Sequence, residues 1–129
     1  MKIVADTNTF LAVALKEPEK AKIIQLTKGH DLVAPEVLPF EIGNALTAML
    51  KKHTLNTSQV TSVWNTVQTI PVEYFRVDIL AALELAAKCN IYAYDAYFLE
   101  CAIRLRCPLL TLNRRLKVVA ENNDVKIQE

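Results

Sequence analysis

The chain has 129 residues, of which 52% are hydrophobic and 22% are charged, and its formal net charge is only +1. This length and composition predict one globular domain over residues 1–129 and exclude a disordered chain. No apolar run is long enough to cross a bilayer or to form a signal peptide, so a cytoplasmic protein without membrane segments is expected.

The first half of the chain alternates short apolar β-type runs with helical periodicity. Small polar residues and prolines mark the helix starts, and Thr7 or Asn8 is the expected cap of the first helix. The predicted elements are a strand at 2–5, helices at 7–16 and 18–28, a strand at 31–34, and a helix at 35–52 whose regular part begins near Pro39.

The second half continues the same alternation, and Asp78 is the expected cap of one of its helices. Its predicted elements are helices at 59–69 and 79–89, a helix from 93 or 95 to 106, a helix at 114–121, and strands at 71–74, 109–111 and 125–127. Short apolar strands separated by helices predict an α/β fold with a parallel sheet. In such sheets, ligands bind at the carboxyl ends of the strands.

Several catalytic motifs are excluded by residues that the chain lacks. Its two glycines, Gly29 and Gly43, cannot form a dinucleotide-binding fingerprint or a Walker-type phosphate loop. The sequences G-x-S-x-G and H-E-x-x-H are absent. The three cysteines have no C-x-x-C spacing, so neither a structural zinc site nor a disulfide framework is expected. Chemistry must therefore come from carboxylates, amides, hydroxyls and basic side chains.

Two acidic residues lie where a site at the strand ends would need them. Asp6 directly follows the first predicted strand, although an Asp there can also simply cap the next helix. Glu41 and Asn44 are three residues apart and share one helix face beside an apolar stripe. The alternative for Glu41 is a position at the edge of the core that reaches solvent.

A third acid and an amide extend this pattern. Asp95 is the single acid in an uncharged segment, and its alternative role is the N-cap of the following helix. Asn113 ends the fourth strand, where a helix cap is the simpler interpretation. Three converging carboxylates would repel one another unless a divalent cation neutralised them, and their hard oxygen ligands suit Mg²⁺ or Mn²⁺.

Basic residues gather late in the chain, between Glu100 and Glu121. A cationic rim beside an acidic metal centre suits a phosphodiester substrate, whereas the alternative is a solvated helix surface. The basic residues concerned are Arg104, Arg106, Arg114, Arg115 and Lys117.

Four segments together resemble one known family. They are residues 3–8 (IVADTN), residues 34–35 (AP) with 40–46 (FEIGNAL), residues 94–97 (YDAY) and residues 109–116 (LLTLNRRL). In order and spacing the chain resembles a PIN domain, and more specifically the VapC-type toxins of bacterial and archaeal toxin–antitoxin pairs. The resemblance implies a three-layer α/β/α sandwich with a central parallel sheet. It also implies a Mg²⁺- or Mn²⁺-dependent endoribonuclease that acts on RNA, usually as a homodimer, and is silenced by a cognate antitoxin protein.

The resemblance also assigns residues. It implies that Asp6, Glu41 and Asp95 are the acidic, catalytic metal-site residues, and that the polar residues Asn8 and Thr111 support them. Asn44, on the face of Glu41, is a further supporting candidate. By charge and placement, Arg114 and Arg115 are candidates for binding an RNA phosphate.

The chain departs from the family pattern at Asn113, where an Asp is common. An amide oxygen can still bind Mg²⁺ but brings no charge, so Asn113 is a candidate ligand and the choice between one and two metal ions stays open. Asn113 also favours a different class of protein, a non-catalytic PIN-like adaptor, against which the three retained acids count. A Mg²⁺-dependent phosphatase would need D-x-D where this chain has Asp6-Thr7-Asn8.

Overall fold

The computed structural model describes all residues from 1 to 129 and contains four strands and seven helices. In chain order they are β1 (Lys2–Ala5), α1 (Thr7–Ala14), α2 (Lys20–Thr27), β2 (Asp31–Pro35), α3 (Leu38–Lys51), α4 (Thr57–Gln68), β3 (Glu73–Phe75), α5 (Ile79–Cys89), α6 (Ala93–Leu105), β4 (Leu109–Leu110) and α7 (Arg114–Asn122). None of the helices combines the length and the apolar character that crossing a membrane requires.

The four strands form one parallel sheet in the order β3-β2-β1-β4. Val4 of β1 pairs with Val33 of β2 on one side and with Leu109 of β4 on the other. These central residues are fully buried, as expected for a parallel sheet that is covered on both faces and therefore has nearly continuous apolar strands. The predicted α/β class with a parallel sheet is confirmed.

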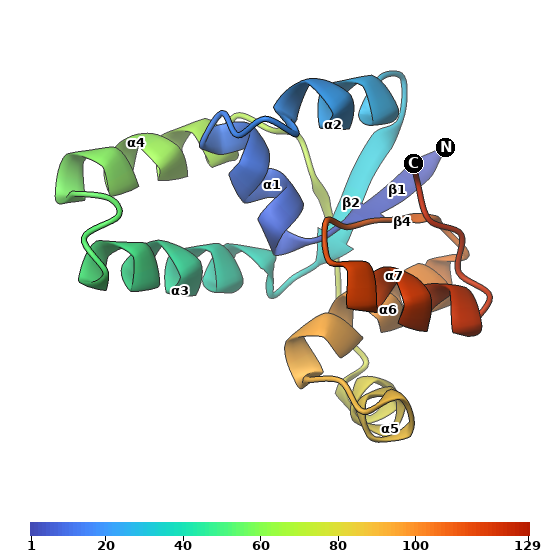
Figure 1. The fold of residues 1–129 in the computed structure, drawn as a ribbon. Coiled ribbons are helices and arrows are strands. Elements are labelled where there is room, and N and C mark those ends of the chain that lie inside the picture. Colours follow the sequence, from blue (N-terminus) through green and yellow to red (C-terminus); the bar gives the residue numbers. More distant parts are fainter.

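The helices complete a sandwich around the sheet. Helices α1 to α4 lie on one side of it, and α5 to α7 lie on the other (Figure 1). Helix α6 packs directly on β1 and β2, and its Phe98 and Leu99 are buried in the core. Leu38 and Ile42 of α3 are buried in the same core. The three-layer α/β/α sandwich is confirmed.

The topology brings several chain segments to one edge of the sheet. Because the strands are parallel, β1 and β4 end at the same edge, and α1 and α7 begin there. Helix α3 begins just after β2 at this edge. Helix α6 leads back to the start of β4, so its first turn also lies toward the carboxyl ends of the strands. The acids predicted from the sequence are carried by these segments.

Some predicted elements differ from the structure. The predicted strand at 125–127 is only a single bridge between Leu109 and Ile127, because β4 has just two residues to pair with. Helix α1 ends at Ala14, and Lys16 beyond it has a left-handed φ of 57°. Asp6, rather than Thr7 or Asn8, caps that helix. The helix predicted from position 18 begins at Lys20, and the strand predicted at 71–74 is Glu73–Phe75.

Candidate active site

A pocket of about 230 Å³ at the carboxyl edge of the sheet contains all three predicted acids. Asp6 precedes α1, Glu41 lies in the first turn of α3, and Asp95 lies in the first turn of α6. We call this hollow the acidic pocket. Its lining residues are Asp6, Thr7, Asn8, Glu41, Asn44, Ala45, Ala48, Asp95 and Phe98. The two predicted supporting amides, Asn8 and Asn44, are thus brought to the same place.

Asp6 is buried and held by two threonines. Its Oδ1 accepts hydrogen bonds from the backbone N–H of Thr9 (3.1 Å) and from the Thr9 hydroxyl (2.7 Å), and its Oδ2 accepts one from the Thr111 hydroxyl. Asp6 therefore caps α1 and also lines the pocket, so both interpretations of this residue hold. The sequence predicts no role for Thr9, although it lies only three residues after the capping Asp6.

Glu41 is half-buried and is bound by one neighbour. The Thr7 hydroxyl donates to Glu41 Oε2 across 2.8 Å, which joins the first turn of α1 to the first turn of α3. The sequence predicts Thr7 only as a possible cap of the first helix, a role that Asp6 takes instead. A contact between residues 34 positions apart leaves no local sequence signal.

Asp95 is the third residue of α6, and Tyr92 occupies the N-cap position of that helix without a side-chain hydrogen bond. The interpretation of Asp95 as the N-cap is therefore wrong. Its carboxylate accepts no backbone hydrogen bond at the helix start, so both of its oxygens are available to the pocket. A carboxylate in the first turn is still favoured by the helix dipole.

The pKa values of all three carboxyl groups are raised, chiefly by burial. Burial is the largest cause that raises the pKa of Asp6, and it outweighs the opposing hydrogen bonds from Thr111 and Thr9. Burial also raises the pKa of Glu41, with further contributions from the charges of Asp95 and Asp6. The pKa of Asp95 is raised by burial and by Asp6, whereas Arg115 lowers it. The pocket therefore concentrates negative charge that a cation would offset.

The donor set fits a hard divalent cation, because it consists of carboxylate, amide and hydroxyl oxygens. In the structure no three His, Cys, Asp or Glu side chains come close enough to form a metal-binding group from protein atoms alone. A cation in this pocket would thus keep several water ligands, which is how Mg²⁺ usually binds. Asp6 retains capacity for this role, because its carboxylate offers about four acceptor positions and the two threonines use three.

Asn113 lies outside the lining of the acidic pocket. Its Oδ1 accepts hydrogen bonds from the backbone N–H groups of Arg115 (3.0 Å) and Leu116 (3.2 Å), which makes it the N-cap of α7. The interpretation as a helix cap is confirmed. The oxygen that would have served as a metal ligand is already occupied by two donors.

Changing Asn113 to Asp should therefore alter metal binding little. The variant should bind Mn²⁺ with an affinity within about twofold of wild type and melt slightly higher, because a carboxylate caps a helix N-terminus well and interacts favourably with its dipole. Calorimetric Mn²⁺ titration and metal-free thermal melting measure the two effects. An affinity that rises several-fold in Asn113→Asp would instead place this side chain beside the cation.

The basic residues divide into two groups. Arg104 pairs with the buried Glu100 at 2.8 Å, Arg106 ends α6 at the opposite end of that helix from Asp95, and Lys117 lies 3.7 Å from Glu129. These three do not form a rim around the acidic pocket. Arg114 and Arg115 begin α7 at the carboxyl edge of the sheet. Arg115 donates to the backbone oxygen of Asn90 (2.6 Å).

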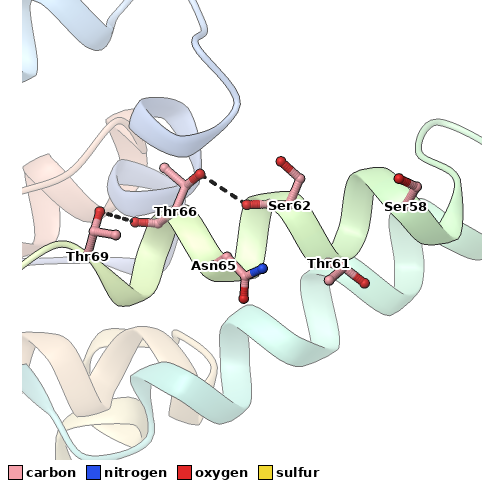
Figure 2. A pocket seen from close by; sticks show the side chains of 6 residues that line it. All are labelled: Ser58, Thr61, Ser62, Asn65, Thr66 and Thr69. Carbon is pink, nitrogen blue, oxygen red and sulfur yellow. Dashed lines mark hydrogen bonds between the residues drawn. The ribbon is translucent and has the colours of Figure 1, made fainter.

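A second hollow, on α4, has a different character (Figure 2). It is lined by hydroxyl and amide side chains of one helix and contains no ionisable group; the residues are Ser58, Thr61, Ser62, Asn65, Thr66 and Thr69. Three of its hydroxyls donate back to the helix backbone, from Thr61 to Thr57, from Thr66 to Ser62 and from Thr69 to Thr66. It offers no acid or base, whereas the acidic pocket gathers the three predicted carboxylates and is therefore the candidate active site.

Comparison with known proteins identifies the family. The family model described as "PIN domain" matches residues 3–122. This match covers most of the chain, so the chain belongs to the PIN domain family, whose members are generally nucleases. No curated protein matches the chain significantly.

Two solved structures share the fold. PAE2754 from Pyrobaculum aerophilum superposes with a TM-score of 0.71 at 18% identity, over 92% of this chain and 79% of that one. VapBC2 from Rickettsia felis, solved bound to a DNA fragment from its promoter, gives a TM-score of 0.71 at 17% identity, over 98% of this chain and 97% of the matched chain. At these identities the likeness establishes the fold alone.

The raised pKa values predict a pH dependence of stability without metal. A carboxyl whose pKa is raised by folding stabilises the fold when protonated, and this contribution is lost as the pH rises through the raised value. The side chain of Asp6→Asn cannot ionise. The melting temperature of this variant minus that of wild type should therefore be higher at about pH 8 than at about pH 4. Melting in EDTA at both pH values measures this difference. A difference that does not change with pH contradicts the prediction.

Proposed function

We propose that the protein is a Mg²⁺- or Mn²⁺-dependent endoribonuclease, the toxin of a type II toxin–antitoxin pair, acting in the cytoplasm as one PIN domain over residues 1–129. The observation that carries the proposal is the acidic pocket. Three carboxylates from separate segments of the chain line it; burial raises the pKa of each, and nearby negative charge raises those of Glu41 and Asp95 further. Membership of the PIN domain family supports a nuclease.

In this function Asp6, Glu41 and Asp95 would hold the cation, directly or through water. A bound divalent cation activates water and offsets charge that develops on a phosphodiester. The protein keeps the ligands in place: Thr9 and Thr111 fix Asp6, and Thr7 holds Glu41. Arg114 is exposed at the start of α7 and would contact a neighbouring phosphate of the RNA, while Arg115 is partly engaged by the Asn90 backbone.

A cleavage assay tests the proposal. Purified protein incubated with single-stranded and structured RNA should cut the RNA in Mn²⁺ or Mg²⁺ and should stop when EDTA is added. Cleavage that continues in EDTA, or that does not follow the protein through the last purification step, would contradict it.

The second candidate is a non-catalytic adaptor that binds RNA or protein. The observation in its favour is that Asn113 brings no fourth charge and is committed to capping α7. RNA binding without cleavage in any divalent cation would favour this function.

A partner protein is part of the proposal. The exposed side of α5 carries Ile79, Leu80 and Leu83, which are 49% to 68% exposed, and such a surface is typical of protein interfaces. The VapBC2 structure supports a cognate antitoxin as one partner and the resemblance to VapC-type toxins supports a homodimer. Sedimentation of the purified protein, alone and co-expressed with the product of an adjacent small reading frame, measures both.

A further inference from the structure

We propose that Thr7 is a positioning residue, whose hydroxyl fixes the Glu41 carboxylate in the acidic pocket and thereby sets the affinity of that pocket for a divalent cation. This inference rests on the proposed function, because it assumes that the pocket binds a cation.

The contact is specific in its geometry. Thr7 Oγ1 lies 2.8 Å from Glu41 Oε2, and no other group of the protein donates a hydrogen bond to this carboxylate. Both side chains line the acidic pocket. The second carboxylate oxygen, Oε1, accepts no hydrogen bond, so one oxygen of Glu41 is tethered and the other is left for a ligand.

Thr7 is itself held rigidly. It is the first residue of α1 and directly follows Asp6, whose side chain caps that helix and is bound by Thr9 and Thr111. The Thr7 hydroxyl therefore stands on the same fixed turn as Asp6. Through it, the position of Asp6, which caps α1, is coupled to that of Glu41 in α3.

Glu41 needs such a tether because of its side chain. A glutamate has several rotatable bonds, and a half-buried one at a helix start can turn toward solvent at little cost. Partners that orient metal ligands commonly change metal affinity by about 10–100-fold when they are removed. A hydrogen bond to an ionised carboxylate is among the stronger ones in proteins.

Two substitutions separate the hydroxyl from the packing of Thr7. Thr7→Val keeps the β-branched shape and removes the donor, whereas Thr7→Ser keeps the donor. Mn²⁺ affinity, measured by calorimetry without RNA, should fall about tenfold in Thr7→Val and stay near wild type in Thr7→Ser. Thr47→Val is the matched control, because Thr47 is exposed on α3 and its hydroxyl bonds only to the Gly43 backbone.

A double-variant cycle tests the route of the effect. If Thr7 acts through Glu41, Thr7→Val should weaken Mn²⁺ binding in the wild-type background and add nothing in a Glu41→Gln background. In the cleavage assay, Thr7→Val should recover at high Mn²⁺ while its KM for RNA stays unchanged. Should Thr7→Val fold poorly, Thr7→Ala removes the same donor and gives the same comparison.

The outcomes separate this inference from the proposed function. If Thr7→Val binds Mn²⁺ as tightly as wild type, or if Thr7→Ser binds it as weakly as Thr7→Val, only the role of Thr7 is overturned. If the wild type binds Mn²⁺ no more tightly than Asp6→Asn does, the proposed metal site is overturned, and the role of Thr7 with it.

Discussion

Replacing Asp95 with alanine should reduce RNA cleavage by on the order of a hundredfold or more, because the change removes a carboxylate that would hold the catalytic cation. The variant should remain folded, since Asp95 caps no helix and its removal relieves repulsion from Asp6 and Glu41. Cleavage rates at saturating Mn²⁺, together with thermal melting of the same samples, measure both effects.

Asp31→Ala is the matched control for this experiment. Asp31 is an exposed acid at the start of β2, at the opposite edge of the sheet from the acidic pocket. Its replacement should leave cleavage unchanged. A folded Asp95→Ala protein that cuts RNA as fast as wild type would show that the acidic pocket is not the site of cleavage.

Replacing Arg104 with methionine should destabilise the protein by about 2 kcal/mol, because the buried Glu100 would lose its charged partner. Arg104 binds Glu100 through Nε at 2.8 Å and also donates from Nη2 to the Arg76 backbone oxygen at 2.7 Å. Its side chain is 39% exposed, which places the loss below that of a fully buried pair. Denaturant unfolding at neutral pH measures the change.

The double variant Glu100→Gln with Arg104→Met isolates the cause of this loss. In the Glu100→Gln background, the change Arg104→Met should lower the free energy of unfolding by less than it does in wild type. A double variant that is destabilised by the full sum of the two single changes would mean that Arg104 stabilises the fold through packing alone.

The sequence was most informative where the physical signal is local. The apolar run at 2–5 followed by Asp6 predicts a buried strand with an acid at its end, and both are present. Asn113 beside the start of a helix predicts a cap, and its two hydrogen bonds confirm it. Such features depend on residues within one turn of each other, so the sequence alone carries them.

Features that depend on distant residues were not predictable in this way. The contact between Thr7 and Glu41 joins two helices. Thr9 bonds to Asp6 locally, but the second oxygen of Asp6 is held only by Thr111, which directly follows β4. The strand expected at 125–127 is reduced to one bridge, because its neighbour β4 is only two residues long. The N-cap of α6 is Tyr92 and not Asp95, because the helix begins two residues before Asp95.

The hydrogen bond from Thr111 to Asp6 spans 105 residues of chain, and it has a consequence for synthesis. During translation Asp6 emerges from the ribosome long before Thr111, which directly follows β4. The hydrogen bond that completes the acidic pocket therefore cannot form before residue 111 has emerged. A polypeptide that stalls before β4 would carry Asp6, Glu41 and Asp95 and still lack the hydroxyl that fixes Asp6 in the acidic pocket.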